Sequence, residues 1–147
     1  MQLKYTFSIL FLFFVTFFLN FHAQTVLSSA TSNEEIEKKI DEYNISNRTK
    51  MWELINLYIK KSKEELNNEA LFYAYRYGSI SSKFPSNLNY ADSALVTANK
   101  SGIKKIVLDA YLNRGNINMT EEFYEKALDD ILVANKLSQE SGDHYIF

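Results

Sequence analysis

Apolar side chains between residues 103 and 137 recur at steps of three and four, the spacing that places them on one face of an α-helix. The pattern restarts after Thr120, so we predict two helices joined as a hairpin. Thr120 is the expected N-cap of the second helix, with Glu121 and Glu122 stabilising its first turn electrostatically. The two apolar faces comprise Ile103, Ile106, Val107, Ala110, Tyr111 and Ile117, then Phe123, Tyr124, Ala127, Leu128, Ile131, Ala134 and Leu137.

The same pattern occurs once more, earlier in the chain. Residues 74–100 match residues 110–136 at a constant offset of 36. An internal repeat with a period in the thirties is typical of stacked helical hairpins, so the predicted fold class is all-α. The identical pairs are Ala74/Ala110, Tyr75/Tyr111, Ala91/Ala127, Ala98/Ala134, Asn99/Asn135 and Lys100/Lys136.

A glycine inside the later hairpin indicates how closely its helices pack. Gly115 lies within the first helix, where glycine costs about 1 kcal/mol relative to alanine. We therefore expect it to allow close approach of the second helix, opposite Ala127 and Ala134. In the earlier unit either Gly78 or Ser79 fits the place of Gly115, and the sequence leaves both alternatives open.

The residues before these units predict a first, divergent hairpin over residues 32–67. Ser32 and Glu35 have the spacing of a capping box, which starts a helix that carries Ile36 and Ile40. A further helix follows, with apolar positions continuing as far as Leu66. The sequence also predicts where later helices end. Residues 84–87, which contain the single proline, are expected to form a turn. The pairs Ser101-Gly102 and Ser141-Gly142 are expected to end helices.

The later unit resembles the tetratricopeptide repeat (TPR) family. Each unit of that family repeats a set of residues at fixed intervals. In order they are a large aromatic residue, a glycine four residues later, a tyrosine, an alanine, a large apolar residue and a second alanine. Four positions depart from the family pattern, and they are Arg114, Asn118, Glu122 and Gln139. The matching residues, expected to pack between helices, are Tyr111, Gly115, Tyr124, Ala127, Ile131 and Ala134, with Ala91, Leu95 and Ala98 in the preceding unit.

The resemblance implies a solenoid of about three repeats whose first helices line a concave groove for a peptide or protein partner. Asn116 would hydrogen-bond a peptide backbone, and the planar guanidinium of Arg76 would bind a carboxylate. The alternative is that these are ordinary surface or packing residues. The residues that the resemblance places in the groove are Arg76, Asp109, Leu112, Asn116 and Met119, with Tyr73 as a further candidate.

The N-terminal residues have the layout of a secretory signal peptide. Lys4 precedes an apolar run over residues 7–19, and the expected cleavage follows Ala23, so residues 1–23 are removed or are retained as a membrane anchor. Residues 24–32 form a linker, and residues 33–147 form the repeat domain, with its last repeat truncated. We expect an exported chain, periplasmic or anchored by the N-terminal segment.

Composition excludes several classes of function. The chain has no cysteine, so disulfides and thiol chemistry are excluded. Its formal net charge of −2 gives no basic surface for nucleic acid. The two histidines, His22 and His144, are far apart in sequence, and the acidic pairs are adjacent residues that point to different sides of a helix. We therefore expect no enzyme activity, no metal and no cofactor.

A broader resemblance gives an alternative function. A signal-like segment, irregular TPR hairpins and the element Tyr90-Ala-Asp-Ser-Ala94 are similar to the N-terminal half of exported bacterial sensors. In those proteins a transmembrane helix and an AraC-type DNA-binding domain or a histidine kinase follow the repeats. The first hypothesis is therefore a binding scaffold, and the second is the sensory part of a membrane-spanning regulator.

Overall fold

A computed structural model describes residues 31–141, and this part of the chain consists of six α-helices with no strand. The all-α prediction is confirmed. The expected signal peptide, most of the linker and the truncated last repeat fall on residues 1–30 and 142–147, outside the described residues. The helices are α2 (Asn33–Ser46), α3 (Arg48–Glu64), α4 (Asn68–Ser81), α5 (Ser86–Ser101), α6 (Lys104–Thr120) and α7 (Tyr124–Ser141).

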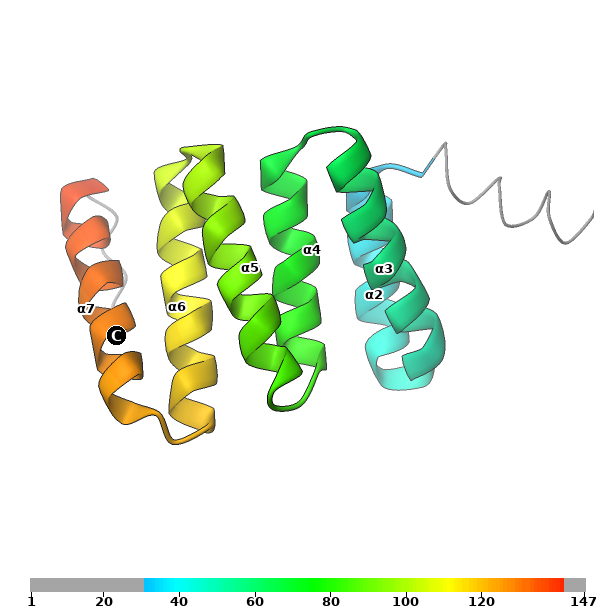
Figure 1. Cartoon of the computed structure of the whole chain (residues 1–147). Helices are drawn as coiled ribbons and strands as arrows, with labels where there is room; N and C mark the ends of the chain where they lie inside the picture. Colours follow the sequence, from blue (N-terminus) through cyan, green and yellow to red (C-terminus); the bar gives the residue numbers. More distant parts are fainter. Residues whose placement is uncertain (1–30, 142–147) are drawn as a thin grey trace, which may run out of the picture.

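Helices α4, α5, α6 and α7 lie side by side in chain order, α2 lies behind α3 at the other end of the row, and successive helices alternate in direction (Figure 1). Each helix contacts the next, and α4 also contacts α6 across α5. Three hairpins result, namely α2 with α3, α4 with α5, and α6 with α7. Because the described helices alternate in direction and their number is even, α2 begins and α7 ends on the same edge of the array (Figure 1).

Side-chain caps explain where three of the helices begin. The Ser32 hydroxyl accepts a hydrogen bond from the Glu35 backbone N–H at 3.1 Å, as the capping-box spacing predicts. Asn47 and Asn67 cap α3 and α4 in the same way. Gly102 ends α5 in the left-handed conformation with a φ of 69°, which confirms the predicted boundary.

The predicted boundary between α6 and α7 is wrong by one turn. Thr120 is the last residue of α6, and its hydroxyl donates to the Asn116 carbonyl instead of capping α7. Glu121 and Glu122 form the turn, and Glu122 has a φ of 63°. Leu66 makes the equivalent turn after α3 with a φ of 53°, so the prediction that it continues the apolar face of α3 is also wrong.

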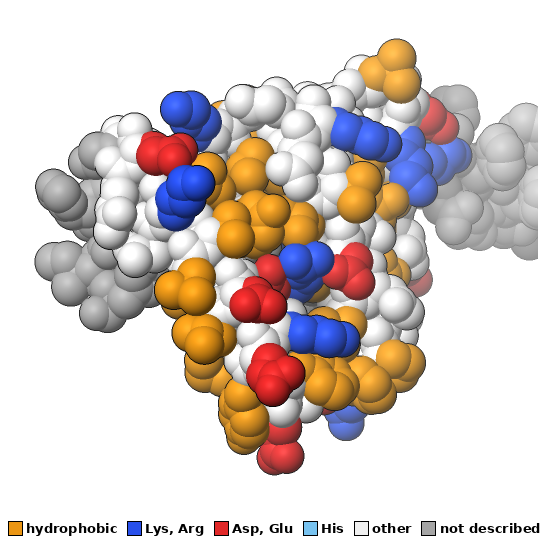
Figure 2. Space-filling view, turned by 60° about the vertical axis from the view of Figure 1, so that its left-hand side comes forward, with side chains coloured by type: hydrophobic (Ala, Val, Ile, Leu, Met, Phe, Trp, Pro, Cys, Tyr) orange, Lys and Arg blue, Asp and Glu red, His pale blue; other side chains and the backbone are white. Residues whose placement is uncertain are grey.

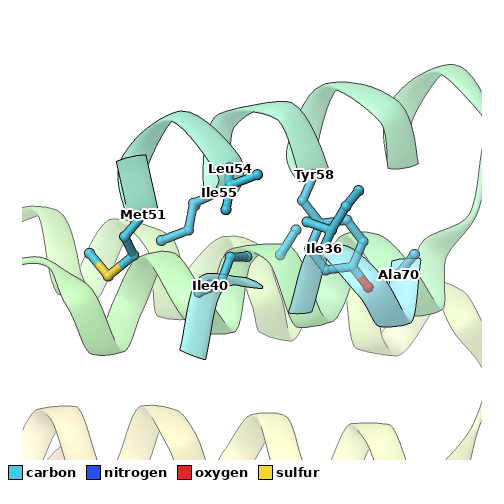
Figure 3. Packing of buried hydrophobic residues seen from close by; sticks show 8 residues of the cluster. Ile36, Ile40, Met51, Leu54, Ile55, Tyr58 and Ala70 are labelled. Carbon is cyan, nitrogen blue, oxygen red and sulfur yellow. The ribbon is translucent and has the colours of Figure 1, made fainter. Parts of the chain in front are cut away.

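The first hairpin and the start of α4 share one apolar core (Figure 3). Ile36 and Ile40 of α2 lie against Ile55 and Tyr58 of α3, and all four are almost completely buried. The expected helical steps therefore direct these residues inward. The buried members of this core are Ile36, Ile40, Met51, Leu54, Ile55, Tyr58, Ala70 and Ala74.

A second core joins α4, α5 and α6. Four neighbouring aromatic residues on α4 pack into different cores. Phe72 is fully buried in the second core, whereas Tyr77 packs against the first. Tyr73 contacts both cores and so links them. The buried members of the second core are Phe72, Ala94, Leu95, Ala98, Ile106 and Ala110.

Two helical glycines mark the places where paired helices approach most closely. A Cβ at Gly115 would lie 3.3 Å from the Cβ of Asp130 and 3.3 Å from Cγ1 of Ile131. A Cβ at Gly78 would lie 2.7 Å from Cδ1 of Tyr90, whose ring lies 6.0 Å from that of Trp52 in α3. Gly78 and not Ser79 therefore takes the place of Gly115 in the earlier hairpin.

The residues expected to pack between helices differ in exposure. Tyr111 is half-buried against the second core, and Ile131 lies beside Gly115. The expectation that Tyr124 packs inside the array is wrong, since it is the first residue of α7 and 63% exposed. The buried members of the set are Ala91, Leu95, Ala98, Gly115, Ala127 and Ala134.

Leu66→Gly should stabilise the fold. Leu66 has a φ of 53° and is 86% exposed, so glycine relieves a left-handed conformation without a loss of buried apolar surface. We expect the free energy of unfolding to rise by about 1 kcal/mol, measured by urea denaturation followed by circular dichroism. The control is Glu65→Gly, one residue earlier with a φ of −82°, which should lower stability. Equal effects of the two variants would contradict the explanation.

Candidate functional site

Four of the five residues expected in the groove line a single hollow of about 900 Å³ between α4 and α6. Arg76 reaches it from α4, and Asp109, Leu112 and Asn116 reach it from α6. Met119 is not among the residues that line this hollow, and it is half-exposed. The remaining lining residues are Ser79, Ile80, Ser82, Lys83, Phe84, Asn87, Asn113, Ile117, Thr120 and Glu121.

Buried polar pairs hold the two sides of this groove at a fixed spacing. The Asn113 amide nitrogen of α6 donates to the Ser79 hydroxyl of α4 at 3.0 Å, and both residues are buried. In the first turn of α5, the Asn87 amide donates to the carboxylate of Glu121, at the end of α6, at 2.6 Å. Because buried polar groups are costly to leave unpaired, the Asn113–Ser79 bond opposes separation of α4 from α6, and the Asn87–Glu121 bond holds α5 to α6.

Both charged and apolar side chains line the groove. Arg76 and Asp109 are polar lining residues, whereas Ile80, Phe84 and Ile117 offer apolar surface, much of it exposed for Ile80 and Phe84. Partial burial raises the pKa of the Asp109 carboxyl, and the positive charges of Arg76 and Lys105 oppose that rise. The groove therefore presents both a charged contact and an apolar contact to anything that lies along it.

A tyrosine-rich surface continues from the groove toward α2. Burial raises the pKa of Tyr77 to about 12, and the nearby carboxylates of Asp41 and Glu37 add to the shift. Burial also raises the pKa of Tyr73, with Asp109 on α6 and Glu37 on α2 contributing. Carboxylates on both α2 and α6 are therefore close enough to Tyr73 to add to the rise in its pKa.

A polar network that the sequence analysis missed joins α5, α6 and α7. The Arg114 guanidinium donates to both carboxylate oxygens of Asp130, at 2.6 and 3.0 Å, and to Asp92 at 3.0 Å. The Asn118 amide donates to Asp130 at 3.1 Å. Asp130 is only 3% exposed, so it needs these partners to remain charged.

Two of the residues that depart from the TPR pattern, Arg114 and Asn118, both bind the buried carboxylate of Asp130. One feature of the sequence could have indicated this network. Asp130 is acidic, yet it lies three residues after Ala127, on the buried side of its helix.

The described residues contain no group of three or more His, Asp or Glu side chains placed to hold a metal ion. Within residues 31–141, none of the helices has the length and apolar character needed to span a membrane. No family model, no curated protein and no solved structure matches this chain in the comparisons with known proteins.

Arg114→Leu should destabilise the protein because it leaves the buried Asp130 carboxylate without its main partner. Breaking a buried ion pair from one side costs about 3–5 kcal/mol, and we expect a loss near that range in urea denaturation. The double variant Arg114→Leu with Asp130→Leu should recover most of the loss, because no buried charge remains. A double variant as unstable as the single one would contradict this role for the pair.

Proposed function

We propose that this chain is a TPR-like helical-repeat scaffold, without catalytic activity, that binds an extended peptide or a protein segment outside the cytoplasm. The observation that carries the proposal is the meeting of Arg76, Asp109, Leu112 and Asn116 in one groove between α4 and α6. The TPR resemblance implies this meeting, because the first helices of successive units line a common binding face in such arrays.

Local backbone geometry also supports the TPR-like assignment. Glu122 stands where the family has its turn glycine, and it adopts the left-handed conformation that glycine favours, with a φ of 63°. Gly78 and Gly115 both face the second helix of their own hairpins, twelve residues before Tyr90 and Ala127 respectively. The two hairpins therefore share one packing geometry although their sequences differ.

The groove has the chemistry that peptide capture needs. Asn116 is exposed, and its amide supplies both a donor and an acceptor for a peptide backbone. Leu112 and Phe84 offer apolar contacts for side chains, while Arg76 offers a charged one. A preformed groove held by buried bonds lowers the entropic cost of binding.

The second candidate function, the sensory part of a membrane-spanning regulator, draws support from the direction of the chain. The first described helix, α2, begins and the last, α7, ends on the same edge of the array (Figure 1). Segments that precede and follow the array would then meet a membrane on one side. Sequencing the gene past the codon for Phe147 tests this candidate: an apolar run of about 20 residues and an output domain support it, and an immediate stop codon contradicts it.

Asn116→Ala should weaken peptide capture without a change in fold. The probe is a phage-displayed library of random linear peptides selected on the full chain, and the affinity of an enriched peptide is measured by fluorescence anisotropy. We expect Asn116→Ala and Leu112→Ala each to weaken binding about tenfold, which corresponds to about 1.4 kcal/mol. Circular dichroism should stay unchanged because Asn116 is exposed.

The matched control is Asn89→Ala, an exposed asparagine on α5 that does not line the groove and should bind as the unchanged chain does. Failure to enrich any peptide, or equal loss of binding in the control, would contradict the proposal. Unfolding of Asn116→Ala would show that Asn116 belongs to the packing and not to the groove.

A further inference from the structure

Two opposite charges line the groove between α4 and α6 without a direct bond between them. Arg76 lines it from α4, and Asp109 lines it from α6. Their charges are close enough to interact, because Arg76 opposes the rise in the pKa of Asp109. Within residues 31–141, no salt bridge or hydrogen bond joins the Arg76 guanidinium to the Asp109 carboxylate. Both groups can therefore form hydrogen bonds with a molecule in the groove.

The charged residues that line the groove are balanced in sign. Arg76 and Lys83 are basic, and Asp109 and Glu121 are acidic. Figure 2, which brings the α7 end of the molecule forward, likewise shows basic side chains next to acidic ones on the surface. Charge complementarity therefore favours neither an acidic nor a basic peptide in this groove.

The charges near Asp109 outside the groove do not change this balance. Lys105 lies one turn earlier on α6, where it is exposed, and its positive charge acts on Asp109. Glu69 and Glu37 carry the opposite charge near Tyr73, on which Asp109 and Lys105 also act. Exposed charges are screened by water, so the charges inside the groove have the larger effect on what binds there.

A charged ligand group gains little between Arg76 and Asp109. A group of either sign is attracted by one of the two residues and repelled by the other, so the two Coulomb energies oppose each other. The cost of removing the charge from water remains. An uncharged amide satisfies both residues, because its oxygen accepts from the guanidinium while its N–H donates to the carboxylate.

We propose that the groove holds an uncharged amide of its ligand between Arg76 and Asp109, so the ligand is a peptide with no charge at this position. This inference rests on the proposed function. It differs from the expectation that Arg76 binds a carboxylate, because Asp109 also lines the groove. The amide is supplied by an asparagine or glutamine side chain or by the peptide backbone, since both have the same donor and acceptor. The exposed amide of Asn116 adds a second contact of the same kind.

A panel of short peptides tests this preference on the full chain. The probes are alanine peptides with blocked ends whose central residue is glutamine, alanine, glutamate or lysine, and NMR follows the backbone signals of Arg76 and Asp109. We expect the glutamine peptide to bind at least about fivefold more tightly than the glutamate and lysine peptides. If the alanine peptide binds as tightly as the glutamine peptide, the backbone supplies the amide; if it binds more weakly, the side chain does. Tighter binding of either charged peptide, or no shift of the two signals with any peptide, would overturn the proposal.

Exchange of the two charges provides an independent test. Arg76→Asp and Asp109→Arg should each weaken binding of the glutamine peptide about tenfold, because one of the two hydrogen bonds of the amide is lost. The double variant should recover most of this loss, since the amide can turn its oxygen toward the arginine on α6. The control is Lys100→Asp, an exposed lysine on α5 that does not line the groove, and it should bind as the unchanged chain does. A double variant as weak as the single ones would show that the site does not hold an amide.

The two proposals fail in different ways. If no peptide binds the groove, the proposed function fails and this inference fails with it. If library-selected peptides bind through Asn116 and Leu112 but the exchange of charges gives no recovery, the proposed function stands and only the amide contact is wrong.

Discussion

The buried carboxylate of Asp130 is the constraint on which the α6–α7 hairpin depends. Its Cβ lies 3.3 Å from the place where a side chain would begin at Gly115, so glycine at this position leaves room for the close contact between α6 and α7. The preceding residue, Arg114, then binds the carboxylate through two hydrogen bonds. Adjacent residues of α6 thus provide the space for Asp130 and the charge that neutralises it.

The groove follows from the same placement of α6. Asp109, Leu112 and Asn116 face α4 because the opposite side of α6 is engaged with α7 through Gly115 and Asn118. Arg114 also reaches Asp92 on α5, so α6 is tied to the second and third hairpins at once. A binding face built from separate helices requires this rigidity, because small shifts between α4 and α6 would change its width.

Much of this arrangement could be predicted from local sequence signals. Helical spacing of apolar residues predicted the helices, Ser32 and Glu35 predicted the first cap, and Gly102 predicted the end of α5, since each signal acts within one turn. Asp109, Leu112 and Asn116 lie three and four residues apart, so a helix places them on one side. Their expected place in a groove with Arg76, however, came from the family resemblance.

The predictions that were wrong share a physical cause. Each of them concerned a contact or a backbone conformation that has no local signature in the sequence. Leu66 and Glu122 adopt left-handed turns that glycine normally marks, so the turns were assigned to the helices. Arg114 was read as a departure from a pattern, because its partner Asp130 lies in another helix. Tyr124 matched a packing position in the family, yet in this chain α7 starts there and leaves the ring exposed.

Hydrogen exchange on the Arg114→Leu variant tests the central role of Asp130 most directly, because it reports stability helix by helix. Loss of the pair should release the backbone amides of α6 and α7 first, while those of α2 and α3, which share an apolar core of their own, should keep their protection. An equal loss of protection in all helices, or unchanged protection in α6 and α7, would contradict the account.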